Sequence, residues 1–133
     1  MIAFFTAVYE HATGSTNDFG TAISNSLHYG HAQDNPTGSY AVVSGLPEVP
    51  ADTFDATIND GEIQFNCFAD DFETCMDVAE KCLARYDKAT LEVSGHYDVR
   101  LFRELVTPPF KADTEPKTEW QAVVTFRYMI QKI

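Results

Sequence analysis

The sequence predicts a single α+β domain over residues 1–133, with a mainly antiparallel four- to five-stranded sheet and two to three helices packed on one face. A length of 133 residues suffices for one domain with its own core and is too short for two. The composition, 44% hydrophobic and 13% aromatic, is typical of a globular chain. Along the chain, segments with helical periodicity precede and interrupt segments with the two-residue repeat of strands.

Two short helices are expected at the N-terminus. Within the first twelve residues, one helical stripe is formed by Phe4, Phe5, Val8 and Ala12. The segment TGSTND interrupts this pattern, and either Asn17 or Asp18 is suited to cap a second helix over about 19–27.

Three strands are expected next. LHY at 27–29 and YAVVSG at 40–45 are rich in strand-forming residues, and the turn sequence QDNPTGS separates them. In EIQFNCFA, 62–69, polar and apolar residues alternate, so that Ile63, Phe65 and Cys67 share one face. This alternation predicts a strand that is buried on one side only.

A long helix is expected over about 70–88. Asp70 is a suitable N-cap, and Glu73 stands three residues later, as a capping box requires. Residues spaced for one apolar stripe are Phe72, Cys75, Met76, Ala79, Cys82, Leu83 and Tyr86. Such a stripe must pack on a flat surface, which the sheet would provide.

Two more strands are expected in YDVRLFRELVT and EWQAVVTFRYMIQ. In the second, one face carries Trp120, Ala122, Val124, Phe126, Tyr128 and Ile130. The prolines in PPFKADTEPKT argue against a central strand there, so we expect 107–118 to project as a long hairpin loop. LPEVPADTFDATINDG, with two prolines and a terminal Asp-Gly, is expected to form an extended connection or an edge hairpin near 46–61.

The opposite face of the sheet is not plainly polar. Apolar side chains predicted to point away from the helices are Phe68, Phe102, Val123 and Met129. Together they indicate a second surface that becomes buried by self-assembly.

The charge is strongly acidic, with 9 Lys and Arg against 20 Asp and Glu, for a net charge of −11. Such a surface repels nucleic-acid phosphates and anionic membranes. MIAFFTAVYEHA lacks the basic start of a signal peptide, and no apolar run approaches the roughly 20 residues of a membrane span. We therefore expect a soluble protein that stays in the cell where it is made, and the odd number of cysteines favours a reducing compartment.

No group of residues predicts catalysis, metal binding or a cofactor. His28 and His31 with Asp34 nearby lack a convincing third zinc ligand. The three cysteines fall on apolar faces, where a thiol is inert. Neither a P-loop, nor G-x-G-x-x-G, nor G-x-S-x-G is present. The residues favour a binding or assembly domain that is not an enzyme.

Several segments, taken in order, resemble the tail-terminator, or tail-completion (head–tail connection), proteins of long-tailed bacteriophages. In the family, a strand with Tyr and Ala leads through a Pro-containing loop into a Tyr-x-Val-Val strand. The matching residues here are Tyr29, Ala32 and Pro36, followed by Tyr40, Val42 and Val43. IQFNCFADDFETCMDVAEKCL has the family's strand that runs directly into a helix, with Phe68 where the family often has Trp. VTFRYMI carries the Arg of the closing strand. The long segments 46–61 and 107–118 depart from the family pattern.

The resemblance implies a structural virion protein of the tail or neck, assembled in the host cytoplasm. It would form a homo-oligomeric ring, in that family usually of six subunits, that caps the tail tube, ends tube polymerisation and docks the tail to the head. Its partners would be itself, the tail-tube protein and a head-completion or connector protein. DNA would pass through the ring without specific binding, and a cluster of carboxylates would face the bore.

We expect the two long segments to contact neighbouring subunits or rings, because their prolines lower the entropy lost on docking. The interface residues expected there are Pro108, Pro109, Phe110, Lys111, Pro116, Lys117, Pro47, Pro50 and Phe54. Three alternatives stay open: another phage neck, tail-tube or baseplate ring protein, a small cytosolic ligand-binding domain, and, disfavoured by charge, a nucleic-acid-binding module.

Overall fold

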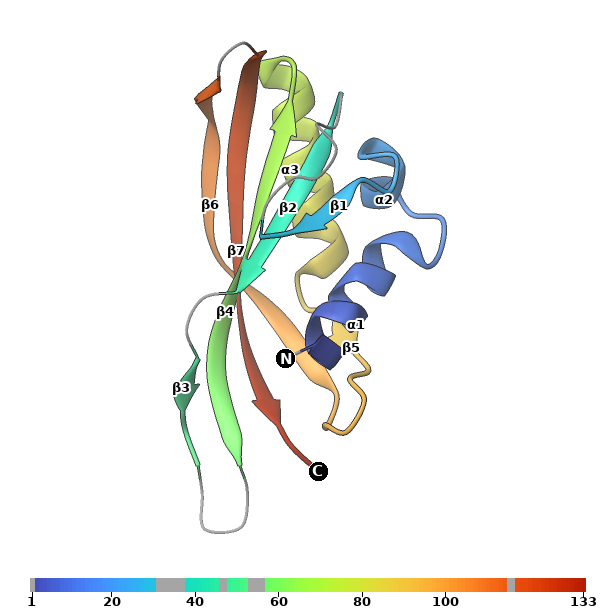
Figure 1. The fold of residues 1–133 in the computed structure, drawn as a ribbon, viewed down its shortest axis with the longest axis vertical. Helices are drawn as coiled ribbons and strands as arrows, with labels where there is room; N and C mark the ends of the chain where they lie inside the picture. Colours follow the sequence, from blue (N-terminus) through green and yellow to red (C-terminus); the bar gives the residue numbers. More distant parts are fainter. Residues whose placement is uncertain (1, 31–37, 46–47, 53–56, 115–116) are drawn as a thin grey trace.

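A computed structural model describes residues 2–30, 38–45, 48–52, 57–114 and 117–133, and their ribbon is drawn in Figure 1. The elements in chain order are α1 (Ile2–Thr13), α2 (Asp18–Ala22), β1 (Leu27–Tyr29), β2 (Tyr40–Gly45), β3 (Val49–Pro50), β4 (Ile58–Ala69), α3 (Phe72–Tyr86), β5 (Thr90–Leu91), β6 (Val99–Thr114) and β7 (Lys117–Gln131).

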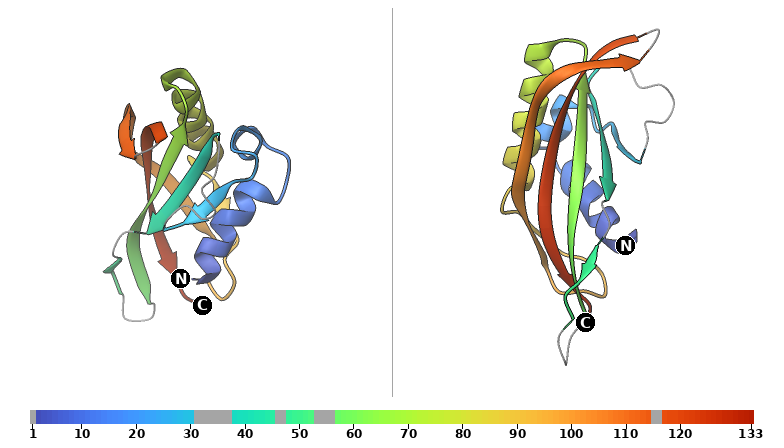
Figure 2. Two further views of the ribbon diagram at one scale, coloured as in Figure 1. Left: turned by 45° about the horizontal axis from the view of Figure 1, so that its top comes forward. Right: turned by 90° about the vertical axis from the view of Figure 1, so that its left-hand side faces the viewer.

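One curved sheet forms the frame of the molecule, and the three helices lie on the same side of it (Figures 1 and 2). The strand order is β1-β2-β4-β7-β6-β5, and β3 pairs with the part of β4 that β2 does not reach. Helix α3 packs across β4, β7 and β6, while α2 packs on α3. We call the side of the sheet that carries no helix the outer face.

The predicted sheet of four to five strands is wrong, because the described sheet has seven strands and is not purely antiparallel. Strands β3 and β5 are two residues each, too short for an alternating pattern to be recognised. Strand β1 pairs with β2 in parallel, with Leu27 opposite Ala41. Alternation in a sequence gives the face of each side chain and carries no information on strand direction.

The expected loop at 107–118 is also largely wrong. Strand β6 continues to Thr114 and β7 begins at Lys117, so the two form one long hairpin. The register between β6 and β7 shifts between Thr107 and Phe110, which brackets Pro108 and Pro109. Prolines are tolerated at such an irregularity because a ladder N–H is not required there.

Of the two expectations for 46–61, the structure favours the edge hairpin, because the described part contains β3, which pairs antiparallel with the first residues of β4. Tyr128 binds this connection to the sheet, because its hydroxyl donates to Glu48 Oε2 at 2.6 Å. Gly61 makes room for the Tyr128 ring: a Cβ at position 61 would lie 2.5 Å from Tyr128 Cζ.

The core lies between the sheet and the helices and follows the predicted alternation. Ile63, Phe65 and Cys67 are buried, which confirms the assigned face of β4. On β7, burial is confirmed for Ala122, Val124, Phe126, Tyr128 and Ile130, with Trp120 half-buried. Phe65 is the centre of the aromatic packing, with ring contacts to Phe19, Tyr86 and Phe126.

The helix caps differ in part from expectation. Asp71, not Asp70, is the N-cap of α3: its Oδ1 accepts from the Thr74 N–H at 2.8 Å, and its Oδ2 from the Thr74 hydroxyl at 2.9 Å. Asn17 caps α2, accepting from the Gly20 N–H at 2.8 Å. Helix α2 ends sooner than expected, because Ser24 and Asn25 adopt positive φ angles of 51° and 58°.

Helices α1 and α3 are joined at their C-terminal ends, where each helix leaves carbonyls without helical partners. Arg85 donates to the His11 carbonyl from Nη2 at 2.7 Å and from Nε at 2.9 Å. In return, the His11 ring Nε2 lies 3.0 Å from the Arg85 carbonyl oxygen. The buried Tyr86 hydroxyl donates to the Val8 carbonyl at 2.6 Å, which fixes α1 against the core.

Candidate assembly surfaces

The outer face of the sheet carries apolar side chains that no helix covers. The structure places Phe68, Phe102, Val123 and Met129 on this face, as the sequence predicted. Phe68 and Val123 are half-buried by their strand neighbours, whereas Phe102 is 42% and Met129 55% exposed. Their burial in an assembly stays a prediction.

A bulge in β6 adds residues that sequence reasoning missed. The register shifts between Arg103 and Leu105, so that Leu105 lies opposite Thr125 on the outer face. Strict alternation would have placed Leu105 on the core face. A hollow of about 630 Å³ lies beside this bulge, a size typical of a ligand or side-chain pocket. It is lined by Glu62, Gln64, Glu104, Leu105, Thr107, Phe110, Val123 and Thr125. No residue pattern in the sequence marks this bulge.

The charged side chains of the outer face include Glu62, Glu104 and Arg127. A hydrogen bond to Glu104, together with burial and the Glu104 charge, raises the pKa of Glu62, and the nearby Arg127 opposes that rise. Elsewhere the face carries amides and hydroxyls, and Gln121 Nε2 donates to Asn66 Oδ1 at 2.8 Å. Among the described side chains of β4, β6 and β7 on this face, none is a nucleophile paired with a base.

A buried carboxyl group lies at the end of the outer face that carries Gln121, and it is hydrogen-bonded within the chain. Glu119 is only 5% exposed, and its Oε2 accepts from the Tyr40 hydroxyl at 2.7 Å. Burial and this hydrogen bond raise the pKa of Tyr40. The Tyr40 ring stacks on Phe68 with a centroid separation of 4.8 Å, so the pair stiffens this part of the outer face.

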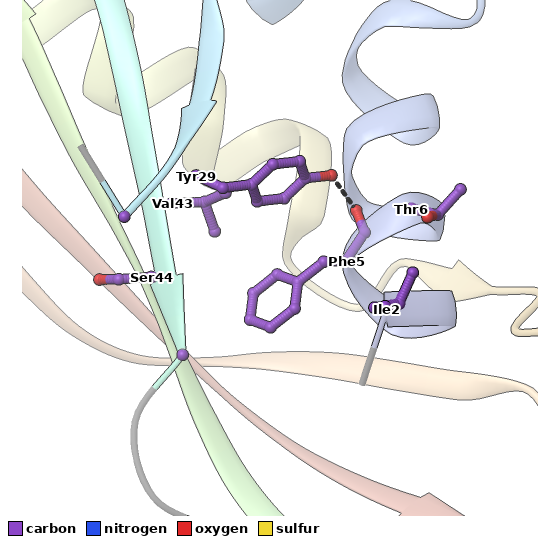
Figure 3. A pocket seen from close by; sticks show the side chains of 8 residues that line it. Ile2, Phe5, Thr6, Tyr29, Val43 and Ser44 are labelled. Atoms are coloured by element: carbon purple, nitrogen blue, oxygen red, sulfur yellow. Dashed lines mark hydrogen bonds between the residues drawn. The ribbon is translucent and has the colours of Figure 1, made fainter. Parts of the chain in front are cut away.

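A second hollow lies between α1 and the ends of β1 and β2 (Figure 3). Its volume is about 580 Å³, typical of a small ligand pocket, and it is lined by Ile2, Phe5, Thr6, Tyr29, Gly30, Val43, Ser44 and Gly45. The Tyr29 hydroxyl donates to the Phe5 carbonyl, and burial raises the pKa of Tyr29 to about 12. The walls are mostly apolar, so this hollow suits an apolar side chain better than a reacting polar group.

The residues first considered for chemistry are not brought together. The ring of His28 lies 2.9 Å from the Ser26 hydroxyl through Nε2, and His31 and Asp34 lie outside the described residues. The three cysteines are fully buried, as predicted, and burial raises the pKa of Cys75 to about 12. Across the described ranges, His, Cys, Asp and Glu side chains do not gather in groups of three that could hold a metal ion.

The expected interface residues lie in three settings. Strand β6 contains Pro108, Pro109, Phe110 and Lys111, and strand β7 begins at Lys117. Pro50 is exposed in β3. Pro47, Phe54 and Pro116 lie outside the described residues. Within the described part of the chain, each helix is too short or too polar to cross a membrane.

Comparison with known proteins gives fold relatives only. No protein-family model and no curated protein matches the chain. It is similar to a chain in the solved structure of the virion of a native gene transfer agent (GTA) particle, with a TM-score of 0.71 and 19% identity, over 95% of this chain and 92% of that one. A second solved structure has a TM-score of 0.66 and 18% identity, over 99% of this chain and 93% of its own. At these identities the likeness establishes a shared fold over almost the whole length.

Proposed function

We propose that this protein is a structural component of a phage-like virion. The observation that carries the proposal is the fold it shares, over 95% of its length, with a chain of a gene transfer agent virion. The sequence resemblance to tail-terminator proteins points in the same direction through independent features, the Tyr-x-Val-Val strand and the strand that runs into α3. The role is one of assembly, without catalysis.

Within the virion, the protein forms a homo-oligomeric ring of six copies that caps the tail tube, ends its polymerisation and docks the tail to the head connector. A closed ring uses a heterologous interface, in which two different patches of each subunit meet. The exposed apolar side chains of the outer face supply one such patch. The tail-tube protein and a head-completion or connector protein are the neighbouring partners.

The charge suits a channel that DNA crosses without binding. Each copy contributes a net charge of −11, so a ring concentrates negative charge around its bore and repels phosphates. The carboxylates that line the bore stay a prediction. The prediction fails if the bore of an assembled ring is neutral or basic.

Deleting the gene in the producing phage or particle tests this function. The expected result is free heads together with tail tubes of uncontrolled length, and a plasmid copy restores joined particles. Negative-stain electron microscopy of the lysate provides the measurement. Tails of normal length joined to heads would refute a terminator. Absence of tubes would indicate a tail-tube subunit, and loss of the distal tip alone would indicate a baseplate ring.

A further inference from the structure

The three cysteines of the chain gather in one part of the core, between α3 and the sheet. Cys67 lies on the core face of β4, and Cys75 and Cys82 lie on the buried stripe of α3. All three are free thiols, and all three side chains are fully buried. Helix α3 packs directly on β4. Two neighbouring elements therefore bring together three oxidisable groups that the proposed assembly role does not use.

Small side chains surround Cys67 in the sheet. Its register partners are Ala41 on β2 and Ala122 on β7, and both are fully buried. Because protein interiors are close-packed, alanines on both sides of Cys67 bring the helix close to the strand at this point. The Cys75 Sγ atom reaches the main chain of β4, since it donates to the Cys67 carbonyl oxygen at 3.4 Å. Side chains of α3 are therefore in direct contact with β4 at Cys67.

Of the two helix thiols, Cys82 is the one that neighbours the Cys67 side chain. Burial raises the pKa of the Cys82 thiol well above its ordinary value, and a hydrogen bond with the Cys67 side chain adds to the rise. The Cys75 thiol is directed instead at the main chain, because it donates to the Cys67 carbonyl oxygen. Cys75 and Cys82 are seven residues apart on one helix, which separates them by about 10.5 Å along its axis. This exceeds the roughly 7 Å between Cα atoms that a disulfide spans, so Cys67 and Cys82 are the pair suited to a cross-link.

We infer that oxidation joins Cys67 and Cys82 in a disulfide that fixes α3 to β4. The bond closes a loop of about 15 residues, which contains the end of β4 and most of α3. In the proposed virion role, the chain meets disulfides once it leaves the reducing cytoplasm of the host, and the cross-link then stabilises the released particle. The bond lies within one chain, so its formation does not depend on the ring.

The reaction is an exchange with a small disulfide such as oxidised glutathione. One cysteine thiolate attacks the small disulfide, which forms a mixed disulfide and releases one glutathione thiol. The second cysteine then attacks the protein sulfur of the mixed disulfide, so that the Cys67–Cys82 bond forms and a second glutathione thiol leaves. The two cysteines lose two electrons and two protons, and the two glutathione thiols take them up. Because the cysteines are buried, the exchange starts only when α3 lifts from the sheet.

Refolding under controlled redox conditions tests the cross-link. The protein is unfolded in urea and diluted into a buffer of reduced and oxidised glutathione, in which exchange is reversible and the most stable pairing accumulates. A parallel sample is refolded with a dithiol reductant. Mass spectrometry after alkylation counts the free thiols, and circular dichroism measures folding and the Tm. The matched variants are Cys67→Ala, Cys75→Ala and Cys82→Ala, since each removes one buried thiol from the same core.

The wild type should keep one free thiol and Cys75→Ala none, whereas Cys67→Ala and Cys82→Ala should each keep both of their remaining thiols. The Tm of the oxidised wild type should lie roughly 10 °C above that of the reduced sample, as expected for a loop of this length. Adding the dithiol to the oxidised protein should abolish the difference. Oxidised Cys75→Ala should show the same increase over its own reduced form, so any cost of the alanine itself cancels.

Three results overturn the inference. The first is a refolded wild type without an internal disulfide, whether its thiols are free or carry glutathione. The second is a disulfide in Cys82→Ala that is as abundant as the one in the wild type, which would assign the bond to Cys67 and Cys75. The third is a cross-linked wild type whose Tm is no higher than that of the reduced protein. None of these results affects the proposed function, which the gene deletion tests separately.

Discussion

Gly61→Ala should destabilise the protein through one defined contact. The new Cβ would lie 2.5 Å from both Cζ and the hydroxyl oxygen of Tyr128, closer than real carbon contacts allow. The Tyr128 ring is almost fully buried and packs on Phe4 at a centroid separation of 4.4 Å, so it has little room to move. Its displacement also breaks the 2.6 Å hydrogen bond to Glu48.

Three effects determine the size of the change. Overpacking a core costs about 1–3 kcal/mol, and the lost hydrogen bond adds about 0.5–1.5 kcal/mol. Replacing glycine within a strand returns about 0.5–1 kcal/mol, because the unfolded chain becomes less flexible. The expected decrease in the free energy of unfolding is therefore about 2 kcal/mol, which corresponds to a decrease in Tm of roughly 8 °C for a domain of this size.

Urea unfolding followed by circular dichroism measures this decrease. The control is the same substitution in a Tyr128→Leu background, where Cζ and the hydroxyl are absent. There Gly61→Ala should change the free energy of unfolding by less than about 0.5 kcal/mol, since interacting residues show their coupling in such a cycle. An equal cost in both backgrounds, or a cost near zero in the wild type, would refute the steric explanation.

Three further outcomes are expected. Asp71→Ala should lower the urea midpoint by removing the cap of α3, whereas Asp70→Ala should leave it unchanged; equal effects would contradict the cap assignment. The thiol reagent DTNB should label no cysteine in the native protein and three after unfolding. Burial raises the pKa of Cys75 to about 12, and the other two cysteines are equally buried. Fast labelling of the native protein would show that the core is open to the reagent. Burial, with a smaller contribution from the Arg85 charge, lowers the pKa of His11 below 6.5 in the folded state. The stability that neutral His11 contributes is therefore present above pH 6.5 and is lost as the pH falls through the lower pKa of the folded state. His11→Gln should therefore show a smaller loss of stability between pH 7.5 and 5 than wild type, and identical pH profiles would exclude His11 as a source.

Many local features were predictable from the residues. Helices α1 and α3, the buried faces of β4 and β7 and the inert cysteines follow from periodicity, because repeats of 3.6 and 2 residues decide which side chains share a face. The cap of α3 was placed one residue too early. Asp70 and Asp71 are chemically equal as caps, and only the backbone path out of β4 decides between them.

The candidate surfaces were predictable only in part. The exposure of Phe102 and Met129 followed from alternation, whereas that of Leu105 depends on the bulge after Arg103. The continuation of β6 to Thr114 was hidden because the double proline was taken as the mark of a loop. In the structure, the paired β7 strand holds the prolines in an irregular but continuous hairpin.

The sequence by itself determined the acidic charge, the helical and strand periods and the side chains that avoid water, since these depend on residue type and on near neighbours. The tertiary structure alone decided the number of strands, the parallel pairing of β1 with β2 and the bulge that turns Leu105 to the outer face. These features depend on contacts between residues far apart in the chain. The free energy of such contacts is shared among many partners, so no single segment determines it.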